Sequence, residues 1–141
     1  MELFTFHFLF FISYFYLYTI LVSIENILKE KSYAFATRIV NLCRYLCSEK
    51  KEFVLSKQIL RSGTSIGAMI REAEFAQSRA DLINKMSVAL KEANETDYWL
   101  SLLRDTDYLD KNMYQSIQFD CVEIIKILVS TVKTAKLMKR E

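Results

Sequence analysis

The stretch Gln58-Ile-Leu-Arg-Ser-Gly-Thr-Ser-Ile-Gly-Ala-Met-Ile-Arg-Glu-Ala-Glu-Phe75 holds both glycines of the chain. The chain contains no proline, and the apolar residues of this stretch recur at helical spacing, which predicts a helix. Each glycine inside a helix costs roughly 1 kcal/mol relative to alanine. Both glycines fall on one helical face, where a second helix can approach closely. The residues expected at this contact, within a bundle or between subunits, are Ser62, Gly63, Ile66, Gly67, Met69 and Ile70.

A phosphate-binding glycine loop is the alternative interpretation of the same stretch. Such a loop follows a strand and contains a Lys-Ser or Lys-Thr pair, and this stretch has neither feature. The helix contact is therefore favoured.

Outward from this stretch, apolar periodicity and turn-type residues divide the chain into further helices. Ser78 and Asp81 have the spacing of a helix cap, and the connections are short and polar, as between antiparallel neighbours. The expected helices span residues 26–48, 53–77, the stretch from Ser78 to about Arg104, and a last segment capped by Asp110 or Asn112. The sequence therefore predicts an all-α protein, an antiparallel up-down-up-down four-helix bundle with an apolar N-terminal extension.

The apolar faces of the first and last helices are broad. In the first helix the expected inward residues are Tyr33, Ala36, Ile39, Val40, Cys43, Leu46 and Cys47. In the last helix one row contains Ile117, Cys121, Ile124, Leu128 and Thr131, and an adjacent row contains Val122, Ile125, Val129 and Val132. A monomeric bundle needs one apolar stripe per helix, so the second row predicts an oligomer contact.

Composition gives broader bounds. The 141 residues suit one domain, and 52% hydrophobic with 26% charged residues is typical of a folded protein. The formal charge of +2 permits an anionic partner without requiring one. Three cysteines in apolar helical patterns are unlike a secreted disulfide framework, so a reducing cytoplasm is expected.

The first 22 residues differ from the rest, because Glu2 is their only charged residue. The run from Leu3 to Val22 is long enough to span a bilayer, which would anchor the bundle in the membrane with its body in the cytoplasm. Two other interpretations stay open: translation beginning further downstream, and an additional packed helix. The expected division is therefore an extension at 1–22 and a bundle domain at 23–141.

The bundle lacks the residues of familiar enzymes. His7, in the extension, is the only histidine, so the bundle has no imidazole base or ligand. Glu92-x-x-Glu95 lacks the histidine of a di-iron site, and Cys43, Cys47 and Cys121 suit core packing better than metal binding. We expect no catalytic residue, no metal and no cofactor.

The basic residues are the remaining candidates for function. Repeated around a symmetric oligomer, a few cations per subunit form a continuous phosphate-binding surface. The candidate nucleic-acid-binding residues are Arg61, Arg71, Arg79, Lys133, Lys136, Lys139 and Arg140.

Three segments together carry a family resemblance. They are Lys29-Glu-Lys-Ser-Tyr-Ala-Phe-Ala-Thr-Arg-Ile-Val40, Gln58 to Ala73 as quoted above, and Lys91-Glu-Ala-Asn-Glu-Thr-Asp-Tyr-Trp-Leu100. Over about residues 25 to 130 the chain resembles the bacterial four-helix-bundle proteins encoded in intervening sequences of large-subunit ribosomal RNA genes. No feature of that family matches residues 1 to 22.

The resemblance implies a helical bundle that assembles as a homopentamer and has no known reaction. It also implies kinship with accessory proteins of diversity-generating retroelements, which bind nucleic acid and a reverse transcriptase. One position departs from the family pattern, since Met69 stands where relatives commonly have asparagine. The function expected from the sequence is RNA or DNA binding by a homo-oligomer, and the alternative is a protein-docking scaffold, membrane-tethered if residues 3–22 insert.

The first prediction concerns the extension. A protein consisting of methionine followed by residues 23–141 should be soluble and helical, because the four amphipathic segments supply one another's apolar partners. Circular dichroism and size-exclusion chromatography measure both properties. Aggregated or unfolded protein would show that residues 1–22 belong to the core.

Overall fold

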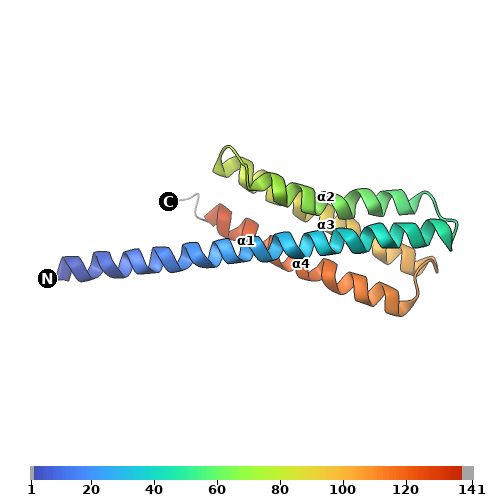
Figure 1. The fold of residues 1–141 in the computed structure, drawn as a ribbon, viewed down its shortest axis with the longest axis horizontal. Coiled ribbons are helices and arrows are strands. Elements are labelled where there is room, and N and C mark those ends of the chain that lie inside the picture. Colours follow the sequence, from blue (N-terminus) through green and yellow to red (C-terminus); the bar gives the residue numbers. More distant parts are fainter. Residues whose placement is uncertain (1, 138–141) are drawn as a thin grey trace.

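The computed structural model describes the backbone of residues 2–137 and the side chains of Ile12, Thr19 and residues 26–137. Its elements are four helices, α1 (Glu2–Ser48), α2 (Leu55–Ala73), α3 (Arg79–Asp105) and α4 (Lys111–Leu137) (Figure 1). Each helix packs against the next, and α4 returns to α1. The chain is thus an all-α four-helix bundle, as the sequence predicts.

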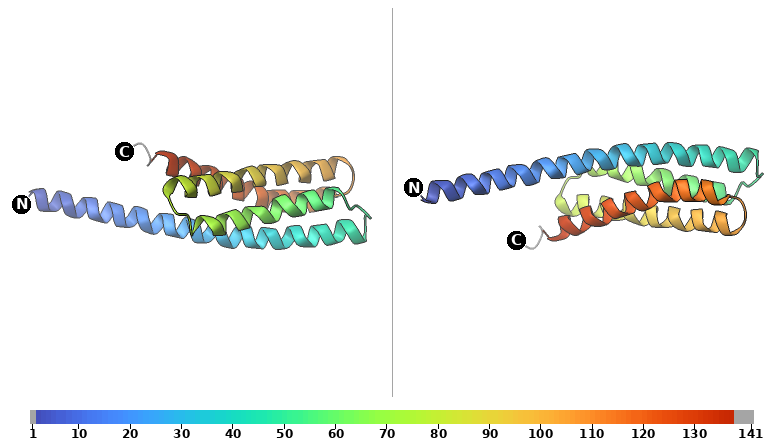
Figure 2. Two further views of the ribbon diagram at one scale, coloured as in Figure 1. Left: turned by 90° about the horizontal axis from the view of Figure 1, so that it is seen from above. Right: turned by 90° about the horizontal axis from the view of Figure 1, so that it is seen from below.

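Helix α1 is much longer than its partners. It runs without a break from Glu2, and its N-terminal part projects beyond the other three helices (Figure 2). The expected helix start at residue 26 is therefore wrong, although a domain boundary between residues 22 and 23 stays a prediction. The proposed membrane anchor and the downstream start both concern residues 1–22, whose side chains, except those of Ile12 and Thr19, lie outside the described ones.

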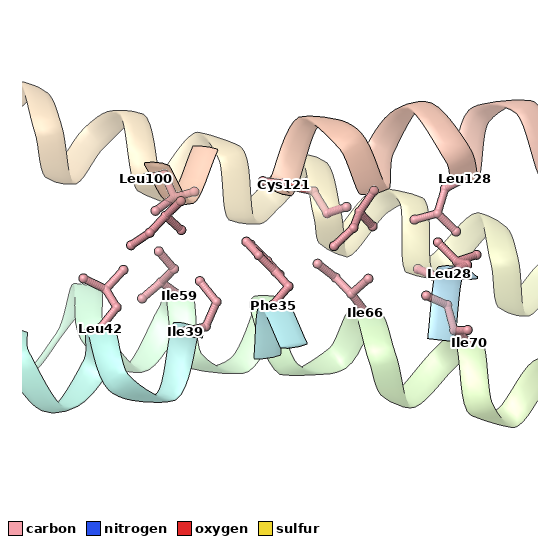
Figure 3. Packing of buried hydrophobic residues seen from close by; sticks show 14 of the residues in the cluster. Leu28, Phe35, Ile39, Leu42, Ile59, Ile66, Ile70, Leu100, Cys121 and Leu128 are labelled. Atoms are coloured by element: carbon pink, nitrogen blue, oxygen red, sulfur yellow. Dashed lines mark hydrogen bonds between the residues drawn. The ribbon is translucent and has the colours of Figure 1, made fainter. Parts of the chain in front are cut away.

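The core is formed mainly by apolar side chains, and the buried positions of each helix recur every three or four residues (Figure 3). This spacing is typical of left-handed bundle packing. On α1 the buried row is Leu28, Ser32, Phe35, Ile39, Leu42 and Leu46. The face expected from the sequence is therefore partly wrong: Val40, Cys43 and Cys47 are half-buried, and Tyr33 is 65% exposed.

The two glycines mark a tight contact between α1 and α2. A Cβ atom placed on Gly63 would lie 2.8 Å from Cγ1 of Ile39, a fully buried side chain. A Cβ atom on Gly67 would lie 3.5 Å from the hydroxyl oxygen of Ser32, which is ordinary van der Waals contact. Both glycines therefore face α1 within the same chain, and Gly63 is the tighter position.

The other face of α2 packs on α3. Ser62 is fully buried, and its hydroxyl accepts a 2.9 Å hydrogen bond from the hydroxyl of Thr96. Ile66 and Ile70 are fully buried in the core, and Met69 packs partly buried against it. Of the six residues expected at a helix or subunit contact, Ser62, Gly63, Ile66 and Ile70 are buried within this chain, and Gly67 and Met69 are half-buried. A contact of these residues with another subunit stays a prediction.

The ends of α2 differ from the expected 53–77. At its start, the Glu52 carboxylate accepts hydrogen bonds from the backbone N–H groups of Val54, Leu55 and Ser56 at 2.9, 2.8 and 2.6 Å. Burial raises the pKa of Glu52, but these donors outweigh it and hold the pKa below its ordinary value of 4.5. The helix ends at Ala73 because the chain must turn into the extended conformation of Ser78.

Two caps predicted from the sequence are confirmed. The Ser78 hydroxyl accepts a hydrogen bond from the backbone N–H of Asp81 at 3.1 Å and begins α3. Asp110 begins α4, because its carboxylate accepts hydrogen bonds from the backbone N–H groups of Asn112 and Met113.

The glycine contact predicts opposite effects for one substitution made at two sites. Gly63→Ala should destabilise the protein, because overpacking against Ile39 costs about 1–3 kcal/mol. That cost is larger than the gain of up to about 1 kcal/mol in helix propensity. Gly67→Ala should be neutral or stabilising by up to about 1 kcal/mol, because its Cβ atom fits. Urea unfolding followed by circular dichroism measures both. Equal stabilities for the two variants would contradict the assignment of Gly63 as the tight position.

Candidate nucleic-acid interface

Ion pairs between neighbouring helices neutralise charge along the sides of the bundle. Lys31 of α1 contacts Glu123 of α4 at 2.9 Å. Arg38 of α1 binds the carboxylate of Asp120 and the backbone oxygen of Ser116, both on α4. Exposed pairs of this kind contribute little stability, roughly 0–1 kcal/mol each, but they leave these cations with less charge to offer a ligand.

Arg61 belongs to this paired group. Its guanidinium reaches across the α2–α3 interface to Glu92, at 3.3 Å, and to Glu95. The hydrogen bond to Glu95 raises the pKa of Arg61, and the hydrogen bonds from Arg61 and then Trp99 lower the pKa of Glu95. Of the described basic candidates, Arg61 is the one that already binds carboxylates. It is therefore the weakest candidate for a phosphate ligand.

Four other candidates lie in helix segments that share one end of the bundle. Because neighbouring helices are antiparallel, the end of α2, the start of α3 and the end of α4 share that end (Figure 2). Arg71, Arg79, Lys133 and Lys136 are all exposed there, and we call these four residues the basic end. Lys139 and Arg140 lie outside the described residues.

Three acidic residues near the basic end are engaged elsewhere, whereas Glu30 of α1, which lines a hollow with Arg71, has no described partner. Glu72 binds Lys85 at 2.6 Å, and Glu74 binds Lys29. Asp81 accepts a hydrogen bond from the backbone N–H of Gln77 at 3.2 Å. Among the described side chains, none of the four cations of the basic end therefore has a carboxylate partner.

Helix electrostatics explains only part of this cluster. Lys133 and Lys136 lie near the C-terminal end of α4, where a cation is stabilised by the helix dipole. Arg79 is the first residue of α3, where the dipole disfavours a cation. Arg71 has its guanidinium carbon 5.7 Å from the centroid of the Tyr33 ring. The helix dipole therefore does not account for the positive charge of Arg79.

The opposite end carries exposed cations that the sequence analysis did not select. They are Arg44, Lys50, Lys51, Lys57 and Lys111, and they surround the α1–α2 and α3–α4 connections. The Lys50-Lys51 pair in a polar turn is the sequence signal that could have identified them. They provide a matched set of charges against which to compare the basic end.

Among the described residues, no side chains are arranged as a metal site or as a thiol site. Within them, no group of three or more His, Cys, Asp or Glu side chains gathers to hold a metal ion. Cys121 is buried in the core, and burial raises its thiol pKa to about 12. Cys47 lies beside Ser56, with 3.7 Å between sulfur and hydroxyl oxygen. Among the residues whose side chains are described, none of the helices contains an apolar run of the length that spans a bilayer.

Comparison with known proteins places this geometry in a family. The sequence model of the 23S rRNA-intervening sequence protein family matches residues 25–130. The chain belongs to this family. A crystal structure of a protein of unknown function from the S23 ribosomal protein family of Bacteroides thetaiotaomicron is 63% identical, with a TM-score of 0.77. The alignment covers 78% of this chain and 98% of that one. No curated protein matches.

The 23S rRNA-intervening sequence match spans the three segments on which the resemblance rests. It includes Arg71 and Arg79 of the basic end and ends before Lys133. The family match therefore covers the α2–α3 part of the candidate interface, and Lys133 and Lys136 of α4 lie beyond it.

Proposed function

We propose that this protein is a non-enzymatic, homo-oligomeric helical bundle that binds structured RNA or DNA through its basic surface. The observation that supports this most is the position of Arg71, Arg79, Lys133 and Lys136 on three helices at one end of the bundle, where none of the four pairs with a described carboxylate. Unpaired cations gathered on one surface attract the phosphate backbone and release its counterions on binding. Such binding depends on shape and charge and needs no base-specific contact.

An exposed apolar stripe on α4 supports the homo-oligomer. Of the second row predicted from the sequence, Val129 is 47% exposed, Val122 and Ile125 are half-buried, and Val132 is buried in the core, so that part of the prediction is wrong. Phe119, which the sequence analysis did not select, is 64% exposed. Phe119, Val122 and Val129 belong to the outer face of α4, whose inner face already packs in the core. In a homo-oligomer, further copies of the chain would cover this stripe and bring their basic ends together. The family resemblance implies five copies. A protein partner such as a reverse transcriptase and a cytoplasmic location are parts of the same proposal.

Neutralising the basic end should weaken nucleic-acid binding. The variant replaces Arg71, Arg79, Lys133 and Lys136 by glutamine, and filter binding of a structured RNA and a DNA duplex is measured from low to high salt. The slope of log affinity against log salt should flatten by about 0.7 to 0.9 for each phosphate that the variant no longer neutralises. The fold should survive, because all four side chains are exposed.

The control neutralises the same number of charges at the opposite end, by replacing Lys50, Lys51, Lys57 and Lys111 with glutamine. Binding close to that of the wild type is expected. An equal loss of affinity in both variants would show that binding has no preferred surface. A wild-type protein that retains no nucleic acid at low salt would contradict the proposal and favour a protein-docking scaffold.

Placing charge on the α4 stripe should break the oligomer. Phe119→Lys combined with Val129→Lys puts two cations into the proposed contact between copies, so the particle mass from light scattering should fall towards that of one chain. Phe53→Lys is the matched control, because Phe53 is 53% exposed but lies outside α4. An unchanged mass in the double variant would show that another surface joins the subunits.

A further inference from the structure

Tyr33 is an exposed aromatic ring at a position where the sequence pattern predicts core. It lies on α1 beside the buried Ser32 but points away from the bundle, with 65% of its surface exposed. The guanidinium of Arg71, from the last turn of α2, lies over the ring, 5.7 Å from its centroid. An aromatic ring and a guanidinium plane are therefore both presented to solvent, next to each other.

These two side chains border a hollow between α1 and α2. It has a volume of about 350 Å³ and is lined by Asn26, Lys29, Glu30, Tyr33 and Arg71. The four residues from α1 are spaced so that they share one face of the helix. Arg71 places the hollow beside the basic end.

The polar groups of the hollow divide into engaged and free ones. Lys29 binds Glu74, so its charge is largely compensated. Asn26 and Glu30 make no hydrogen bond or ion pair with any other described side chain, and Arg71 has only its contact with Tyr33. One wall of the hollow is therefore formed by the Tyr33 ring and the Arg71 guanidinium. The Asn26 amide and the Glu30 carboxylate also line it and have no partner among the described side chains.

We infer that this hollow binds an unstacked nucleobase of the nucleic acid, an inference that rests on the proposed function. Sequence-tolerant binding of single-stranded segments uses aromatic rings and arginine planes on which bases stack. Tyr33 and Arg71 provide those planes. Asn26 and Glu30 face the edge of the base, where a carboxylate accepts hydrogen bonds from exocyclic amino groups.

A phosphate group suits this hollow less well than a base. The carboxylates of Glu30 and Glu74 lie in it or beside it, and they repel an anion. The same carboxylates attract the amino groups of a base. The phosphates on either side of that base then lie towards the cations of the basic end, so one single-stranded loop can use both features.

A purely structural role for the pair would be a clamp between α1 and α2. A cation–π contact at an exposed site is worth about 0.5–1 kcal/mol, which is enough to hold two side chains together. That role requires neither a hollow nor free polar groups at its edge. It predicts that Tyr33 substitutions change stability slightly and leave nucleic-acid binding unchanged.

The test uses the full chain and an RNA hairpin that carries a fluorescent adenine analogue in its single-stranded loop. Wild-type protein should quench the analogue by stacking, and so should Tyr33→Phe and Tyr33→Trp, which keep an aromatic plane. Tyr33→Ala and Tyr33→Leu should not quench it, and their affinity should fall about 5- to 150-fold, the decrease expected for one base–aromatic stack. The salt slope should stay at the wild-type value, since no phosphate contact is removed.

Two controls separate this inference from the proposed function. Leucine has bulk but no aromatic ring, so a decrease in RNA affinity common to Tyr33→Ala and Tyr33→Leu reports the loss of the ring itself. Circular dichroism checks that both variants are folded. Glu30→Gln should keep quenching while it changes the preference among loop bases.

Wild-type affinity and quenching in Tyr33→Ala would overturn the nucleobase site. If neutralising the basic end still abolished binding, the proposed function would stand without it. Absence of any RNA or DNA binding by the wild type would overturn both.

Discussion

The close approach of α1 and α2 at Gly63 is the contact on which the rest of the bundle depends. Ile39 packs directly against the backbone of α2, because no Cβ atom intervenes at Gly63. One turn further along α2, Gly67 faces Ser32 of α1. The Ser32 hydroxyl donates a hydrogen bond to the backbone oxygen of Lys29 at 3.1 Å. A polar side chain is thus buried while its hydroxyl stays hydrogen-bonded. The same register rotates Tyr33 out of the core and over α2, where it meets Arg71.

The fold could be predicted from the sequence because its signals are local. Ser78, Asp81 and Asp110 mark helix starts by their spacing, and their hydrogen bonds are those the spacing predicts. The core row of α1 could not be predicted in the same way. A broad apolar face does not show which row is central, and the true row contains Ser32, a residue that hydrophobicity does not select. The Glu52 cap was also missed, because its carboxylate binds backbone groups two to four residues ahead without a preceding cap signal.

The candidate site was predictable in its residue types but not in its arrangement. Arg61 and Glu95 lie in different segments of the sequence, and only the packing of α2 on α3 brings them together. Packing against α3 and α1 likewise gives Glu72 and Glu74 their lysine partners, which leaves Arg71 without either carboxylate. A list of basic residues therefore contains both neutralised and unpaired cations, and the helix interfaces decide which is which.

This division has an electrostatic consequence. A carboxylate a few ångströms from a cation cancels most of its field at distances much larger than their separation, and salt screens the rest beyond the Debye length, about 8–10 Å. Arg38 and Lys31, each held beside a carboxylate on α4, thus contribute little to the long-range potential. The cations without a carboxylate partner dominate it, and most of them lie at the two ends of the bundle, with Lys91 of α3 and Lys126 of α4 as exceptions. One end also carries the hollow at Tyr33, where the exposed ring lies beside the Arg71 guanidinium. Under the proposed function, charge attracts a nucleic acid to that end, and the ring beside Arg71 gives a base a plane on which to stack.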